Sequence, residues 1–233
     1  MNPFKFSRQT LTPKQRYGGQ VIHSERDQFG LIQVIDSPIC RSLHFDTAVK
    51  QSRYFFHAPL TLAFEYQQVL EQQLWHHAQQ RPLNSLLMLG VGGGSLASKL
   101  HIMFPKLQMT LVDLRQSVID IAHDFFHLPI HPHIQTLSED AAVFMQAPPQ
   151  PYDAIIVDLF DAQGMPEVFT QPAFLQQLIH ASALPGLLLI NLWQSTPEPT
   201  LRVIQYMETF GNIILLPIHS SKNLILQYRP VAQ

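Results

Sequence analysis

Residues 86–100 read LLMLGVGGGSLASKL, and this stretch decides the fold. Four apolar residues lead into Gly90, Gly92 and Gly94, with Gly93 between the last two, and a helical pattern begins near Ser95. A short run that is apolar at every position is typical of a parallel strand that is covered on both faces. Glycines let the backbone turn sharply and approach a ligand closely, and the N-terminus of the following helix offers free N–H groups. The stretch indicates a nucleotide-binding loop, or otherwise a glycine turn needed only for strand–helix packing.

Apolar runs alternate with helical patterns on both sides of this loop. The expected further strands cover residues 109–112, 133–137, 154–157, 187–192, 213–217 and 224–228, and the expected helices lie within 59–80 and over 96–103, 117–126, 141–146, 173–183 and 199–210. Such alternation predicts a Rossmann-like α/β fold with a doubly wound, mostly parallel sheet. Only residues 218–222 join the last two strands, which permits a hairpin but no parallel crossover. The sheet should therefore end with one antiparallel C-terminal strand, which is the architecture of the class I methyltransferase fold.

The N-terminal part of the chain has a different pattern. Between about residues 20 and 45, three short segments carry β-branched and apolar residues, with turn residues at 27–30 and 36–38. We expect a small antiparallel β-meander here. The chain then divides into an N-terminal extension, residues 1–58, and a cofactor-binding domain, residues 59–233.

Composition narrows the class of protein. A chain of 233 residues that is 46% hydrophobic can bury a core, and its net charge of −2 leaves no basic footprint for nucleic acid. The single cysteine, Cys40, excludes an internal disulfide framework, and the scattered histidines lack the spacing of a metal motif, so no metal is expected. No apolar run reaches the ~20 residues of a membrane helix. The residues before Gln20 lack the apolar stretch of a signal peptide. We expect a cytoplasmic protein with no membrane partner.

Acidic residues follow three of the expected strands. Asp113 lies about 20 residues beyond the glycines, where an acid can accept hydrogen bonds from both ribose hydroxyls, or cap the next helix. Asp140 can reach an adenine edge or cap a helix. Asp158 leaves a fully apolar strand, with Asp161 three residues later, and is either a functional group or a solvated loop acid. An NAD-binding domain is disfavoured because Ser95 stands at the position of the third dinucleotide glycine.

With these motifs the sequence resembles the spermidine synthases (polyamine aminopropyltransferases) and the spermidine synthase-like proteins around them, over roughly residues 19–228. RSLHFDTAVKQS, residues 41–52, is similar to the family's stretch that ends at a cofactor-facing glutamine, here Gln51. LVDLRQSVIDIAHDFF, residues 111–126, is similar to the acidic strand end and its helix, and SEDA provides the adenine-site acid, Asp140. VDLFD, residues 157–161, matches the D-x-x-D catalytic loop.

The resemblance implies a co-substrate, S-adenosylmethionine or its decarboxylated form, bound by Gln51, by the glycine loop and by two strand-end acids. It implies that Asp158 deprotonates or orients the attacking amine, while Asp161 helps to hold a polyamine. A carboxylate suits that role because an ammonium group must lose its proton before it attacks the carbon next to the sulfonium. Family members often form homodimers or higher homo-oligomers.

Several residues depart from the family pattern. The family's glycine loop carries an Asp that pairs with the free amine of the decarboxylated co-substrate, and Gly93 stands at that position here. Leu159 and Phe160 replace small hydroxyl residues, Ala162 replaces a proline, and Tyr66 is the one candidate match to the family's Tyr-His-Glu segment. These differences leave three hypotheses open. They are aminopropyl transfer to a diamine such as putrescine, methyl transfer from S-adenosylmethionine to an unknown acceptor, and a non-catalytic diverged homologue.

Overall fold

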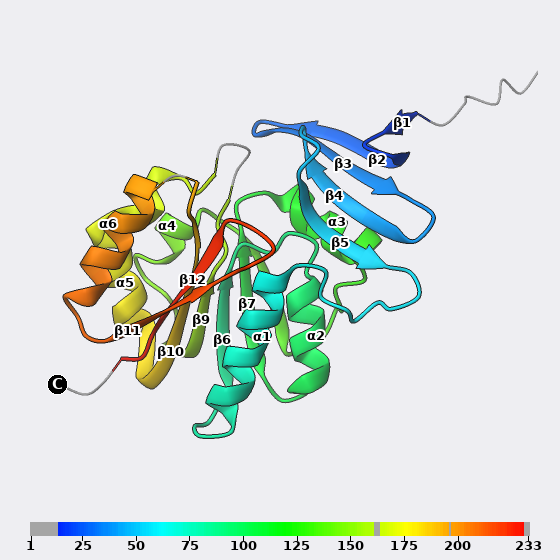
Figure 1. Ribbon diagram of the computed structural model, residues 1–233. Coiled ribbons are helices and arrows are strands. Elements are labelled where there is room, and N and C mark those ends of the chain that lie inside the picture. The colour runs from blue at the N-terminus through cyan, green and yellow to red at the C-terminus, as the bar shows by residue number, and fades with distance from the viewer. Residues whose placement is uncertain (1–13, 161–163, 196, 231–233) are drawn as a thin grey trace, which may run out of the picture.

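The computed structural model describes residues 14–160, 164–195 and 197–230, which form two sheets with helices around the larger one (Figure 1). The N-terminal sheet has five strands in the order β1-β2-β3-β4-β5, and the central sheet has seven in the order β11-β12-β10-β9-β6-β7-β8. The predicted α/β architecture with an N-terminal antiparallel meander is confirmed.

The N-terminal sheet is larger than the expected three strands. All of its neighbouring strands are antiparallel, and they are β1 (Gln15–Arg16), β2 (Gly19–Asp27), β3 (Gly30–Asp36), β4 (Cys40–Phe45) and β5 (Lys50–Phe55). The sequence pattern missed β5 because its first four residues, KQSR, are polar. Polar and charged residues are common on an edge strand, where they discourage pairing with another chain.

The central sheet has a parallel core. Its strands are β6 (Ser85–Leu89), β7 (Gln108–Asp113), β8 (Ile134–Ser138), β9 (Tyr152–Val157), β10 (Ser182–Trp193), β11 (Ile213–Pro217) and β12 (Asn223–Tyr228). Strands β10, β9, β6, β7 and β8 pair in parallel, and β12 is antiparallel to both of its neighbours. The C-terminal strand is antiparallel, as predicted, but it does not end the sheet. It lies between β10 and β11 and pairs with both.

Helices cover both faces of the central sheet. They are α1 (Glu65–Ala78), α2 (Ser95–Met103), α3 (Gln116–Phe126), α4 (Ala141–Phe144), α5 (Pro172–Ala181) and α6 (Pro197–Glu208), with a 3₁₀ turn over Glu167–Thr170. Helices α1 and α2 pack on one face, and α4, α5 and α6 pack on the other (Figure 1). Helix α5 ends at Ala181 rather than at residue 183, because strand β10 already begins at Ser182.

A third apolar cluster joins the N-terminal sheet to helix α3. Ile32, Val34 and Leu43 of the sheet pack against Val118, Ile121 and Phe126 of the helix, and all six are nearly or fully buried. This contact holds the N-terminal sheet beside the glycine loop. The division of the chain at residues 58 and 59 stays a prediction.

Within the described residues, no helix has both the length and the apolar character needed to cross a membrane.

Candidate active site

A cavity of about 950 Å³ lies at the carboxyl ends of the parallel strands, where the N-terminal sheet meets the central one. Its walls come from the start of β3, the β4–β5 region, the start of α1, the glycine loop, the ends of β7, β9 and β10, and the β11–β12 turn. This is the edge of an open α/β sheet at which ligands bind. The predicted site residues that line the cavity are Gln51, Gly90, Gly92, Asp113, Asp140 and Asp158.

The glycine loop forms the floor of the cavity. Gly90 and Gly92 have φ angles of 92° and 52°, in the left-handed region that favours glycine. A Cβ at Gly90 would overlap the backbone carbonyl oxygen of Asp158, and one at Gly92 would lie 2.9 Å from Ser52 Oγ. Gly94, the third predicted glycine, is not among the residues that line the cavity. It is the N-cap of α2 and packs against Leu128.

Asp113 ends β7 and faces the cavity from beside the glycine loop. Its carboxylate accepts hydrogen bonds from the backbone N–H of Val91, at 2.9 Å, and of Arg115, at 3.1 Å. Burial raises the pKa of this carboxyl, while N–H groups of Val91, Arg115 and Gly92 oppose the rise. Asp113 is not the N-cap of α3, since Arg115 holds that position without a side-chain cap. A partly buried carboxylate with spare lone pairs in a nucleotide-sized cavity is suited to bind hydroxyls.

Asp140 has a structural position that is compatible with a binding role. It is the N-cap of α4, and its Oδ1 accepts a hydrogen bond of 2.7 Å from the N–H of Ala142. Both Asp140 and Ala141 line the cavity. The helix-capping alternative is therefore realised, and the other oxygen of Asp140 remains available for a ligand.

Gln51 lines the cavity from β5, next to a residue that the sequence pattern did not single out. Ser52 Oγ accepts a hydrogen bond of 2.7 Å from the N–H of Gly93, so the N-terminal sheet is tied directly to the glycine loop. A local signal for this contact is absent, because Ser52 and Gly93 are 41 residues apart in sequence.

Asp158 lies at the end of β9, where two donors hold its carboxylate. Tyr66 donates its hydroxyl to Oδ2 at 3.1 Å, and Asn191 donates its amide to Oδ1 at 2.7 Å. Burial raises the pKa of Asp158, and the hydrogen bonds from Asn191 and Tyr66 act in the opposite direction. The predicted partner, Asp161, lies outside the described residues, as does Ala162.

Sequence reasoning missed Asn191, although a signal was present. It is a single polar residue within the apolar run GLLLINL of β10, and it is 1% exposed. A buried amide has to find hydrogen-bond partners, so a polar residue inside an otherwise apolar parallel strand points to a neighbouring functional group.

The part of the cavity beyond Asp158 has an aromatic wall and a polar rim. Phe160 and Trp193 meet edge to face, with ring centroids 6.4 Å apart, and Ser220, Ser221 and Asn223 line the cavity from the β11–β12 hairpin. Leu159 also lines it. Apolar side chains thus line the cavity near Asp158, as predicted, together with polar groups of the hairpin.

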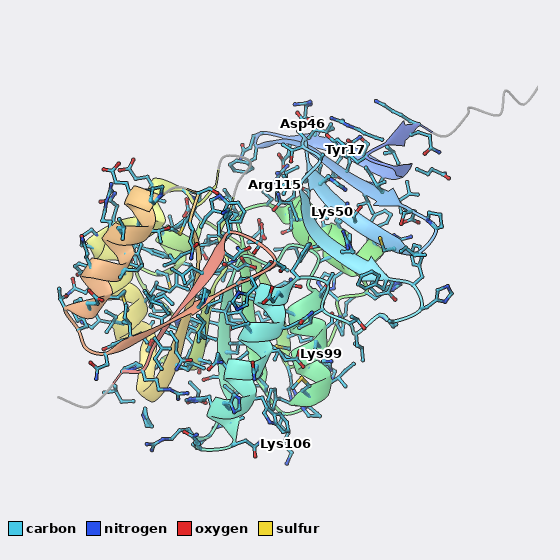
Figure 2. All side chains as sticks on the ribbon, in the orientation of Figure 1. Tyr17, Asp46, Lys50, Lys99, Lys106 and Arg115 are labelled. Carbon is cyan, nitrogen blue, oxygen red and sulfur yellow. The ribbon has the colours of Figure 1, made fainter. Side chains whose placement is uncertain are left out.

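Arg115 fastens the N-terminal sheet over the Asp113 side of the cavity. Its guanidinium makes two hydrogen bonds of 2.9 Å to the carboxylate of Asp27 and one of 3.1 Å to the carbonyl of Gly30. Figure 2 labels Arg115 and Lys50 at the boundary between the N-terminal sheet and the rest of the molecule. Phe29, Gly30 and Leu31 at this turn line the cavity.

Among the described residues, no group of three or more His, Cys, Asp or Glu side chains is arranged to hold a metal ion.

Comparison with known proteins agrees with this geometry. The family model described as the spermine/spermidine synthase domain matches residues 67–213, which is more than half of the chain. The polyamine aminopropyltransferase of Neisseria meningitidis serogroup A is 25% identical over 186 residues, covering 79% of this chain and 70% of that protein.

Two further similarities concern the fold and a second class of transferase. The crystal structure of a probable spermidine synthase from Corynebacterium glutamicum superposes with a TM-score of 0.77 at 20% identity, over 89% of this chain and 79% of that one. The eEF1A lysine and N-terminal methyltransferase of Xenopus laevis is 28% identical over 164 residues, which cover 63% of this chain but only 23% of that protein.

Proposed function

The chain belongs to the spermine/spermidine synthase domain family, and from that premise we propose that it transfers an aminopropyl group from decarboxylated S-adenosylmethionine to a diamine such as putrescine. Curated relatives such as the Neisseria protein are named polyamine aminopropyltransferases, which are transferases. The observation that carries the proposal is the position of Asp158, a partly buried carboxylate at the carboxyl end of β9 that faces the cavity beside the glycine loop.

Asp158 has the chemistry that this transfer needs. Each of its oxygens accepts one hydrogen bond from the protein, so each keeps a lone pair for the acceptor amine. An ammonium group bound there gives a proton to the carboxylate, and the freed nitrogen lone pair attacks the propyl carbon bonded to sulfur. The C–N bond forms as the C–S bond breaks, and the sulfonium takes the electron pair and leaves as neutral methylthioadenosine. Because this leaving group is good, positioning supplies most of the acceleration.

The donor is proposed to lie over the glycine loop. Gly90 and Gly92 allow its close approach, Asp113 accepts from the ribose hydroxyls, and Asp140 faces the adenine edge, with Gln51 contacting the donor from the N-terminal sheet. Support comes from the placement of all five residues on the cavity wall. Asp161 stays a candidate for holding the polyamine.

Methyl transfer is a second candidate, favoured by one observation at Gly93. The family's acid at this position pairs with the amine of the decarboxylated donor, but here Ser52 and Phe126 occupy the space of a side chain. Without that acid the carboxylate of intact S-adenosylmethionine meets no repulsion at this point. The similarity to the Xenopus methyltransferase points the same way.

A side-by-side assay separates these functions. Purified protein is titrated calorimetrically with S-adenosylmethionine and with its decarboxylated form, and methylthioadenosine release is then measured with putrescine. We expect tighter binding of the decarboxylated donor and amine-dependent release. Asp158→Asn should abolish turnover and keep donor affinity, because the new amide keeps the shape of the side chain while it cannot take a proton.

Asp153→Asn is the matched control, since Asp153 lies at the other end of the same strand and bonds the backbone N–H groups of Asn84 and Ser85. This variant should keep its turnover. Tighter binding of S-adenosylmethionine with no release of methylthioadenosine would replace the proposal with methyl transfer. Binding of neither donor would favour a non-catalytic homologue.

A further inference from the structure

Two buried amides lie one behind the other next to Asp158. Asn191 is in β10 and is 1% exposed, and Asn223 is the first residue of β12 and is 8% exposed. In the antiparallel ladder Asn223 pairs with Trp193, two residues beyond Asn191, so both amides point to the same face of the sheet. Burying an amide costs free energy unless its groups are hydrogen-bonded, so both amides need partners.

The hydrogen bonds between them all run in one direction. An ionised carboxylate only accepts, so the Nδ2 group of Asn191 faces Asp158 Oδ1, at 2.7 Å. Asn191 Oδ1 then accepts from Asn223 Nδ2 at 2.9 Å, and Asn223 Oδ1 accepts from the hydroxyl of Ser221 at 2.6 Å. Every donor in this series of hydrogen bonds points toward Asp158. The acceptor Asp158 fixes the orientation of the Asn191 amide, and Asn191 in turn fixes that of Asn223.

In the described part of the protein, one other side chain donates a hydrogen bond to Asp158, and it is the hydroxyl of Tyr66 on α1. The described charged residues that line the same cavity are Asp46, Lys50, Arg53, Glu65, Asp113, Arg115 and Asp140. None of these described residues donates a hydrogen bond to Asp158. The orientation of the carboxylate therefore depends on Tyr66 and on the amide chain.

We propose that Ser221, Asn223 and Asn191 act as positioning residues, a directed hydrogen-bond chain through which the C-terminal hairpin holds Asp158 as an acceptor facing the amine. The inference rests on the proposed function, because these residues orient the carboxylate that is proposed to accept the proton of the amine. It explains why a polar residue stands in the middle of β10. It also gives the antiparallel strand β12 a part in the chemistry, since a strand elsewhere in the sheet could not present Asn223 to Asn191.

The hydrogen-bond chain from Ser221 to Asp158 determines the direction in which the pH dependence of activity should change. Burial raises the pKa of Asp158, and donation from Asn191 opposes that rise. Activity that needs the ionised carboxylate is present above the folded pKa and is lost as the pH falls through it. Weakening the donor chain should therefore move the acidic limb of the kcat/KM profile to higher pH.

The test is Asn223→Asp, which keeps the shape of the side chain and removes the amide donor. The carboxylate introduced in β12 would draw the Nδ2 of Asn191 toward itself and turn the amide oxygen of Asn191 toward Asp158. We expect the acidic limb to move upward, with a roughly tenfold loss of kcat/KM below the wild-type limb for each unit moved. Ser221→Ala should move it in the same direction by less, and it keeps the test open if Asn223→Asp does not fold.

The pKa of Asp158 can also be measured without turnover, by NMR titration of its ¹³C-labelled carboxyl. If the resonance titrates at higher pH in the variants while the wild type consumes no amine, the positioning chain stands and the proposed function fails. If the wild type turns over and neither the limb nor the NMR titration moves in folded variants, the positioning chain is overturned.

Discussion

At the scale of single residues, Gly93 shows why a family motif cannot be transferred letter by letter. A Cβ at Gly93 would lie 2.8 Å from Ser52 Cβ and 2.9 Å from Phe126 Cδ1, which is closer than carbon atoms pack. The N–H of Gly93 is also held by Ser52 Oγ at 2.7 Å. The contact between the N-terminal sheet and the glycine loop therefore leaves no room for an acid at this position. Any side chain at residue 93 would have to displace Ser52 or Phe126.

We predict that Gly93→Ala lowers the free energy of unfolding by about 1–3 kcal/mol, the usual cost of overpacking a filled site. Urea denaturation of wild type and variant measures this cost. In a Phe126→Leu background, where the ring is gone, the added cost of Gly93→Ala should shrink. Equal costs in the two backgrounds would show that the ring of Phe126 does not crowd a side chain at Gly93.

At the scale of elements, Arg115 connects the start of α3 to the β2–β3 turn. Its side chain is 9% exposed and its two-pronged hydrogen bonds reach Asp27, which also accepts from Ser117 Oγ at 2.9 Å. The ring centroid of Phe45 lies 4.8 Å from the guanidinium carbon. Since the N–H of Arg115 also bonds Asp113, one residue links the cover of the cavity to the proposed ribose-binding acid.

We predict that Arg115→Lys weakens donor binding several-fold and leaves the turnover number largely unchanged, because lysine cannot reproduce the planar two-pronged contact. Calorimetric dissociation constants and steady-state kinetics check this. A double-mutant cycle with Asp27→Asn should give a coupling of about 1–3 kcal/mol. A cycle that closes with no coupling would mean that the pair is incidental.

The contact between Arg115 and Asp27 should also depend on pH. Burial alone would raise the pKa of Asp27, but hydrogen bonds from Arg115, Phe29 and Ser117 together lower it. A lowered carboxyl pKa contributes stability above the unfolded pKa, and that stability is lost as the pH falls through the folded value. The Arg115–Asp27 contact should therefore weaken in acid, as the pH falls through the lowered pKa of Asp27.

At the scale of the whole molecule, the cavity is closed from three directions. The central sheet supplies the floor with Gly90 and Asp158, the N-terminal sheet supplies the wall with Gln51, and the C-terminal hairpin supplies the rim with Ser221. The apolar cluster at α3 fixes the first two relative to each other. A ligand in the cavity should therefore stabilise segments that are far apart in sequence.

We predict that the nucleoside donor slows amide hydrogen exchange over residues 29–31, 45–53, 90–92 and 113–115 together, and that residues 220–223 gain protection only when a diamine is added. At about 100 times the dissociation constant, the donor should add ~2.7 kcal/mol of stability. Asp113→Ala is the control and should show much less protection at the same donor concentration. Protection confined to the glycine loop would contradict a site shared by both sheets.

The local pattern of the chain was enough to predict much of the fold. Apolar runs that end in glycines or acids specify strands covered on both faces, and the short link at 218–222 specifies a hairpin, because such constraints act within a few residues. Motifs and family resemblance together predicted Gln51, Gly90, Gly92, Asp113, Asp140 and Asp158, all of which line the cavity. The local pattern failed for β5, whose polar residues carry no strand periodicity, and it placed β12 at the edge.

The sequence by itself determined the class of the fold, the glycine loop and the acids at the strand ends, since strand direction alone brings those ends to one edge of a sheet. Only the tertiary structure decided what surrounds them. Ser52 fills the space at Gly93, Asn223 reaches Asp158 through Asn191, and Arg115 finds Asp27. These contacts join residues 32 to 88 positions apart, and the physical reason they cannot be predicted locally is that they form only when separate elements pack together.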